Sequence, residues 1–175
     1  MGYAGGTTPD PTYRNMGDHT ETLQIKFNPD QISYSALLEI FWSDHNPSSY
    51  PYSRQYRAVV FYHNPEQKEL AEKTREELAE KTGRNVYTAI EPYTNFYSAE
   101  DYHQKYYLQA NRRLIGELKE IYPDFTDLVY STAAARINGY IMGYGTSEEL
   151  ERDLPELGLS ERAQSDLISA FQRRN

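Results

Sequence analysis

The chain has 175 residues and a mass of 20.4 kDa, the size of one domain or of one domain with a small appendage. With 18 basic and 26 acidic residues its net charge is -8, so neither nucleic acid nor a membrane is an expected partner. Its 17 tyrosines and 6 phenylalanines are too many aromatic residues for a disordered acidic chain. There is no cysteine, which excludes disulfides, thiolate metal ligands and a thiol nucleophile within these residues.

The first part of the chain predicts alternating strands and helices. Residues 1–17 are rich in glycine and proline and predict an irregular loop. After it, Leu23, Ile25 and Phe27 alternate with polar residues, as in a strand that is buried on one face. The expected strands are 22–27, 57–62 and 86–90, and the expected helices are 33–45 and 65–82, with Gly83 ending the second helix.

From Asn111 onward only helices are predicted. Their expected ranges are 112–121 and 127–142, followed by two shorter helices with Ser147 and Ser160 as N-caps. The expected domains are therefore a core over 1–110 and a helical extension over 111–175. Three strands make a thin sheet, because sheets of this kind usually have four or more strands and an uncovered edge promotes aggregation. The pattern hints that part of the sheet is missing.

Polar residues are densest between Tyr13 and Glu21. Glu21 stands two positions before Leu23, so alternation places its carboxyl on the apolar face of the strand, where a carboxyl can keep its proton near neutrality and act as a general acid. The alternative is that Glu21 reaches solvent at the strand end or pairs with Arg14. His19 and Glu21 lack a third ligand at useful spacing, so no metal is expected, and no glycine-rich phosphate loop indicates a cofactor. Taken alone, Tyr13 is a turn residue and Tyr56 a packing aromatic.

Several blocks of residues together carry a family resemblance. The blocks are the Gly-Tyr-Ala-Gly-Gly and Pro-Thr-Tyr motifs within 2–13, Gly17-Asp-His-Thr-Glu21, Ile32-Ser-Tyr34, Phe41-Trp42, Gln55-Tyr56-Arg57, Phe96-Tyr97-x-Ala-Glu100 and Tyr102-His-Gln-Lys-Tyr106. They resemble the A-type peptide-methionine sulfoxide reductases over residues 2–109. The resemblance implies an α+β fold, a ferredoxin-like two-layer sandwich that is incomplete at its N-terminus, with a C-terminal helical extension.

The resemblance also implies an oxidoreductase of protein repair under oxidative stress. Such an enzyme reduces the S-epimer of methionine sulfoxide, free or in peptides and proteins, through attack of a cysteine thiolate on the sulfoxide sulfur. A second cysteine converts the resulting sulfenic acid to a disulfide, which thioredoxin reduces, and no cofactor is implied. By position, Glu21 corresponds to the carboxylic acid that binds and protonates the sulfoxide oxygen. Tyr13 and Tyr56 correspond to the phenols that hydrogen-bond the same oxygen.

The sequence departs from the family pattern in its sulfur chemistry. The Gly-Cys-Phe-Trp-Gly motif with the nucleophile is absent, no resolving cysteine is present, and Pro51 stands near the place of an aspartate in many members. We therefore expect this chain to be inactive as given. One hypothesis is a truncated reductase, for instance a member whose selenocysteine codon was read as a stop. The other is a non-catalytic module that binds methionine sulfoxide or a partner. No signal peptide is recognised, so the expected location is cytoplasmic.

Overall fold

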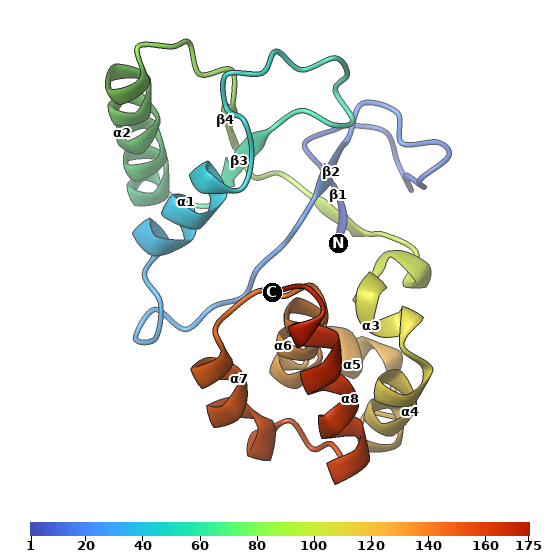
Figure 1. Ribbon diagram of the computed structural model, residues 1–175. Coiled ribbons are helices and arrows are strands. Elements are labelled where there is room, and N and C mark those ends of the chain that lie inside the picture. The colour runs from blue at the N-terminus through green and yellow to red at the C-terminus, as the bar shows by residue number, and fades with distance from the viewer. The chain divides into compact units, whose positions relative to one another are not determined.

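The computed structural model describes residues 1–175 and divides into two compact units, Met1–Glu100 and Asp101–Asn175 (Figure 1). The first unit contains all five strands and two helices, α1 (Tyr34–Ser43) and α2 (Pro65–Thr82), and the second unit is helical. The chain is therefore α+β with a helical C-terminal part, as predicted. No helix has the length and apolar character needed to cross a membrane.

The strands of the first unit form two separate small sheets. β1 (Gly2–Ala4), β2 (Thr20–Thr22) and β5 (Phe96–Ser98) form an antiparallel sheet with the order β2-β1-β5. β3 (Val59–Tyr62) and β4 (Ala89–Pro92) form a parallel pair. Both β2 and β3 are therefore edge strands, each paired along one side only.

Two differences from the predicted strands have one physical cause, the presence or absence of a partner strand. The loop predicted over 1–17 contains strand β1, where Tyr3 and Ala4 are each 1% exposed between the two neighbouring strands. The strand predicted over 22–27 ends at Thr22, and residues 23–28 belong to no strand because none pairs with them. Alternation identified the apolar residues of this segment but not whether a neighbour exists.

The two helices of the first unit follow their local signals. α1 (Tyr34–Ser43) begins after Ser33, whose side chain accepts a hydrogen bond from the Ala36 N–H, the N-cap arrangement that the sequence predicts. α2 (Pro65–Thr82) ends at Gly83, whose φ of 63° lies in the left-handed region favoured by glycine. The two helices lie side by side next to the β3–β4 pair (Figure 1).

The second unit is a set of short helices around its own apolar core. The helices are α3 (Tyr106–Ala110), α4 (Arg112–Ile121), α5 (Phe125–Tyr130), α6 (Thr132–Ile141), α7 (Ser147–Asp153) and α8 (Glu161–Gln172). The single helix predicted over 127–142 is two helices, because Ser131 is extended and its hydroxyl caps α6 by accepting from the Ala134 N–H. Leu108, which lies within the predicted 1–110 core, is fully buried with the leucines of this helical unit.

A polar network is buried inside the helical unit. The Tyr140 hydroxyl donates a 2.7 Å hydrogen bond to the Asp153 carboxylate, which also lies 3.4 Å from the guanidinium of Arg136. Burial alone would raise the pKa of Asp153, but the hydrogen bonds from Tyr140 and Arg152 and the nearby arginine charges hold that pKa below its usual value. The carboxylate therefore stays charged although its residue is only 5% exposed.

Candidate functional site

The candidate site lies next to a set of hydrogen bonds that join the loop at Gly5–Thr8 to the turn before β2. The Asp18 carboxylate accepts hydrogen bonds from the backbone N–H groups of Thr7 and Thr8 at 2.8 and 3.0 Å and from both of their hydroxyls. These four donors hold the pKa of Asp18 far below its usual range. At Gly6 a Cβ atom would lie 2.6 Å from the Asp18 carboxylate, so only glycine fits this close approach.

His19 joins the same loop and turn through the buried side of the loop. Its side chain is fully buried, its Nδ1 accepts the Gly6 N–H at 3.2 Å, and its Nε2 lies 2.9 Å from the Thr8 carbonyl oxygen. An acceptor role at Nδ1 and a donor role at Nε2 require the neutral imidazole with its proton on Nε2. Both ring nitrogens are therefore engaged with the backbone of the loop, and His19 positions the loop rather than offering a metal ligand.

Glu21 is fixed by a two-way contact with Gln55. Its backbone N–H donates to the Gln55 carbonyl oxygen at 3.0 Å, and its Oε1 accepts from the Gln55 Nε2 at 2.9 Å. On the paired strand β1, Tyr3 stands opposite Glu21, and the Tyr3 hydroxyl donates to Glu100. Glu21 is half-buried, and its partner is a neutral amide and not Arg14, the alternative that the sequence left open. The contact with Gln55 engages one of the two oxygens of the Glu21 carboxyl.

Tyr13 and Tyr56 meet beside this carboxyl. A side-chain hydrogen bond with Tyr13 is the largest of several causes that raise the pKa of Tyr56 to about 12, followed by desolvation and by the nearby ionisable groups Tyr13, Glu21 and Tyr52. The backbone N–H of Tyr13 donates to Glu100 Oε1 at 3.0 Å, which anchors its turn. The structure thus brings the three predicted side chains, Glu21, Tyr13 and Tyr56, into one cluster.

An arginine behind the cluster ties the two sheets together. The Nε of Arg57 donates to the Thr20 hydroxyl at 3.0 Å, and its guanidinium forms an ion pair with Glu91 of β4. The hydrogen bond from Arg57 holds the pKa of Glu91 below its usual value. The Thr20 hydroxyl in turn donates to the Arg54 carbonyl oxygen at 3.0 Å. These contacts fix β2 against the segment that carries Gln55 and Tyr56.

Sequence reasoning missed two residues of this neighbourhood. Gln55 belonged to one of the family-like blocks, but its contact with Glu21 joins segments that are far apart in the sequence, and nothing local announces it. Tyr52 is 82% exposed, and its ring centroid lies 5.7 Å from that of Tyr56. An aromatic residue in a loop rich in serine and proline is the only sequence signal for Tyr52.

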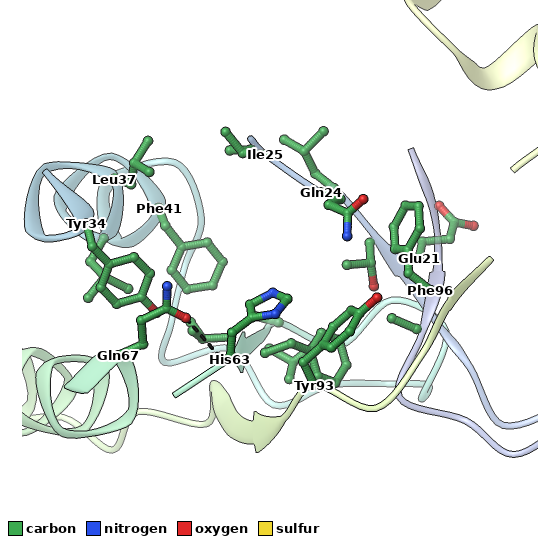
Figure 2. Close-up of a pocket in the computed structure, with 18 of the residues that line it drawn as sticks. Glu21, Gln24, Ile25, Tyr34, Leu37, Phe41, His63, Gln67, Tyr93 and Phe96 are labelled. Atoms are coloured by element: carbon green, nitrogen blue, oxygen red, sulfur yellow. Dashed lines mark hydrogen bonds between the residues drawn. The ribbon is translucent and has the colours of Figure 1, made fainter. Parts of the chain in front are cut away.

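A groove opens next to Glu21, and we call it the intersheet groove. It has a volume of about 340 Å³ and is lined from three sides: by the 21–27 segment, by α1 and by β3. In Figure 2, Glu21 and Phe96 lie at one end of the groove, and Tyr34, Leu37 and Gln67 lie at the other. The larger part of its lining is aliphatic or aromatic, including Ile25 and Phe41.

The fold and the cluster define a class of protein: an α+β domain that presents a carboxyl and two phenols together at the edge of a sheet, without a thiol. Residues 1–122 match the family model described as peptide methionine sulfoxide reductase. The chain therefore belongs to the peptide methionine sulfoxide reductase family, as the resemblance in its motifs predicted.

Named relatives support the same membership. A peptide methionine sulfoxide reductase of Drosophila melanogaster is 40% identical over 162 residues, which cover 91% of this chain and 65% of the relative. The MsrA protein of Methanothermobacter thermautotrophicus is 42% identical over 125 residues, which cover 65% of this chain and 73% of the relative. This chain thus spans less than two thirds of the Drosophila protein.

A solved structure shows the same fold. The reduced form of Mxr1 from Saccharomyces cerevisiae is similar with a TM-score of 0.58 and 32% sequence identity, over 64% of this chain and 70% of the yeast protein. Both the yeast protein and the Drosophila relative therefore contain residues outside the matched part.

Proposed function

We propose that this chain supplies the oxygen-binding half of a methionine sulfoxide reductase site. The observation that carries the proposal is the cluster of Glu21, Tyr13 and Tyr56. A sulfoxide oxygen is a hydrogen-bond acceptor, so a site for it needs donors, and a phenol whose pKa is about 12 keeps its proton at neutral pH. In this proposal two phenols and one carboxyl polarise the S=O bond without placing a cation beside the sulfur.

The proposed reaction is the reduction of methionine S-sulfoxide to methionine. A thiolate attacks the sulfoxide sulfur while Glu21 and a tyrosine hydroxyl give their hydrogen bonds, and then a proton, to the oxygen. The attack forms a bond between the two sulfur atoms, and the protonated oxygen then moves to the attacking sulfur. As this new S–O bond forms, the S–S bond and the original S–O bond break, so methionine leaves as a thioether and the attacking sulfur is left as a sulfenic acid. A second thiol condenses with the sulfenic acid to a disulfide and water, and the two electrons that reopen the disulfide come from a dithiol, thioredoxin in this proposal.

The nucleophile in this proposal comes from a segment outside these 175 residues. The chain has no cysteine, whereas Glu21, Tyr13 and Tyr56, the groups proposed to hold the oxygen, lie together. The Drosophila and yeast proteins both contain residues beyond the matched part, which gives such a segment a place in the family. Translation of the nucleotides upstream of Met1 in the same frame tests this: a Gly-Cys-Phe-Trp-Gly block, or the same block with a stop codon for selenocysteine, supports it.

The assembled cluster without a thiol also favours a second candidate, a module that binds oxidised methionine without reducing it. The two candidate functions make different predictions about the translated sequence upstream of Met1 and about sulfoxide turnover. The chain alone is expected to show no dithiothreitol-dependent sulfoxide reduction under either one. After a segment with the Gly-Cys-Phe-Trp-Gly motif is joined before Gly2, only the reductase proposal expects turnover.

In that joined protein, Glu21→Gln tests the role of the carboxyl. Loss of a general acid lowers the rate by roughly 10²–10⁴-fold, while the amide keeps a similar shape and can still accept the Gln55 hydrogen bond. A suitable control is Glu39→Gln, since Glu39 is an exposed carboxylate of α1 that lies outside the cluster. Unchanged turnover in Glu21→Gln would remove Glu21 from the proposed reaction.

A further inference from the structure

The loop before Tyr56 carries an exposed aromatic ring directly beside the candidate site. Tyr52 is 82% exposed, and its ring centroid lies 5.7 Å from that of Tyr56 with an angle of 35° between the two ring planes. Tyr52 is also one of the ionisable groups that raise the pKa of Tyr56. The tyrosine rings therefore continue from the cluster of Glu21, Tyr13 and Tyr56 onto the surface of this loop.

The loop that carries Tyr52 is anchored on both sides of this residue. Before it, the Pro47 carbonyl oxygen accepts a hydrogen bond from the Tyr87 N–H at 2.8 Å. After it, the Arg54 guanidinium donates to the Gly5 carbonyl oxygen at 2.9 Å. The loop also contains two prolines, which restrict its backbone dihedrals. Contact of a ligand with Tyr52 therefore requires little ordering of the loop, a cost that would otherwise weaken binding.

The exposure of Tyr52 exceeds what the sulfoxide oxygen itself requires. Tyr13 and Tyr56 are 40% and 46% exposed, so a substrate can reach them, and Tyr52 is almost twice as exposed as either. A single exposed tyrosine far from any site needs no explanation. One that continues a binding surface adds a flat apolar face beside the bound ligand, and tyrosine does so with little loss of conformational entropy.

The spacing of the Tyr52 and Tyr56 rings is close to the spacing of residues in a polypeptide. An extended chain advances by about 3.3–3.6 Å per residue, so the 5.7 Å between the two centroids corresponds to roughly one to two residues. An oxidised methionine with its oxygen at Tyr56 therefore brings a residue one or two positions away in the same chain to Tyr52. Free methionine sulfoxide has no such residue and cannot make this contact.

We infer that Tyr52 is a specificity-determining residue, which contacts a large apolar side chain one or two positions from the oxidised methionine of a polypeptide substrate. The inference rests on the proposed function, because that function places the sulfoxide oxygen beside Tyr56. It adds a preference for the residues that flank the methionine. Favoured substrates are oxidised methionines within apolar segments, such as those that unfolding exposes from a protein core.

Binding of two matched peptides to the full chain tests the inference. Their sequences are Lys-Phe-Phe-Met-Phe-Phe-Lys and Lys-Ala-Ala-Met-Ala-Ala-Lys, each with acetylated and amidated ends and with methionine as the S-sulfoxide. We expect the Phe-flanked peptide to bind about two- to tenfold more tightly than the Ala-flanked one, the range that one aromatic contact contributes. In a chain labelled at tyrosine Cζ, the Tyr52 resonance should shift with the Phe-flanked peptide only.

Tyr52→Ala and Tyr50→Ala are matched variants within the same loop. Tyr50 is 76% exposed, but its ring contacts Tyr87 and not Tyr56, so it lies outside the proposed contact. Both side chains are largely in solvent, and both variants are therefore expected to fold. We expect Tyr52→Ala to bind the two peptides equally and Tyr50→Ala to keep the preference for the Phe-flanked peptide. Tyr52→Phe should also keep most of the preference, because the contact is made by the ring.

Three results would overturn the inference: equal affinity of the unaltered chain for the two peptides, a preference that survives in Tyr52→Ala, or a preference that Tyr50→Ala also removes. The thioether forms of both peptides separate the inference from the proposed function. Equal affinity for the two sulfoxide peptides, each bound more tightly than its thioether, would reject the role of Tyr52 and support the proposed function. A preference that depends on Tyr52 but is equally strong for the thioethers would support the apolar contact and count against the proposed function.

Discussion

The substitution Tyr13→Phe perturbs the site most clearly, and its effect is measured as a change in the pKa of Tyr56. The hydrogen bond with Tyr13 is the largest cause that raises the pKa of Tyr56 from 10.0 to about 12. With a pKa of about 12, roughly one tenth of Tyr56 is ionised at pH 11, whereas a pKa near 10 leaves roughly nine tenths ionised. Removal of the Tyr13 hydroxyl should therefore raise the ionised fraction of Tyr56 at pH 11, towards the value for a pKa near 10.

The assay is a carbon NMR titration of tyrosine labelled at Cζ, with Tyr56→Phe used to assign its resonance. Tyr50→Phe is the matched control, because Tyr50 is an exposed tyrosine of the same loop that contacts Tyr87 and not Tyr56. We expect Tyr13→Phe to lower the pKa of Tyr56 and Tyr50→Phe to leave it unchanged. Equal ionisation of Tyr56 at pH 11 in wild type and Tyr13→Phe would refute the claim that these phenols share one site.

The raised pKa of Tyr56 also determines how the stability of the folded chain changes with pH. The folded chain keeps the Tyr56 proton up to about pH 12, whereas the unfolded chain releases it near 10.0. The folded state therefore binds more protons than the unfolded state between these values, and stability falls as the pH rises through this range.

Three further predictions concern contacts around the site and inside the helical unit. Gln55→Leu should weaken sulfoxide binding several-fold, and in the Glu21→Gln background the same change should have a different effect, because Gln55 acts through the Glu21 carboxyl; additive effects in a double-mutant cycle would contradict this. The low pKa of Asp18 stabilises the folded state above the unfolded pKa of about 3.9, and this contribution is lost as the pH falls, so Asp18→Asn should flatten the acid side of a melting-temperature profile; an unchanged slope would contradict it. Tyr140→Phe removes a donor to the buried Asp153 carboxylate and should lower the free energy of unfolding by ~1.5–3 kcal/mol in urea titrations, with a loss below ~0.5 kcal/mol as the contrary result.

Helices of this chain were predictable because their signals are local. Ser33 caps α1, and Pro65 and Gly83 bound α2, as the sequence predicts. A helix satisfies its hydrogen bonds within one segment, so its limits depend on few neighbouring residues. There are two exceptions. At Ser131 a hydroxyl suited to an N-cap divides one predicted helix into two, and the N-cap of α7 is Thr146 and not the predicted Ser147, which is the first residue of that helix.

Strands were less predictable because each one depends on a distant partner. Gly2–Ala4 has the composition of a loop, yet it lies between two strands and pairs with both. Residues 23–28 have the alternation of a strand but lack a neighbour to pair with. Composition and alternation describe the faces of a segment, whereas pairing depends on the rest of the chain.

The three side chains of the candidate site were named from the sequence, but the contacts that hold them in place were not. Glu21, Tyr13 and Tyr56 were identified together from family-like motifs, and their roles in the reaction remain proposals. The contacts that hold them were not readable from the sequence, because Gln55 and His19 act across long separations. A polar residue next to a motif does not reveal which backbone group it bonds.

Binding of sulfoxide to the chain itself tests the central claim most directly. N-acetyl-methionine sulfoxide methylamide and the corresponding methionine amide differ only by the oxygen, and the Cζ resonances of Tyr13 and Tyr56 report contact with it. The account predicts saturable shifts of both resonances with the sulfoxide, none with the thioether, and weaker binding in Glu21→Gln. Equal shifts with both compounds, or no shift with either, would contradict it.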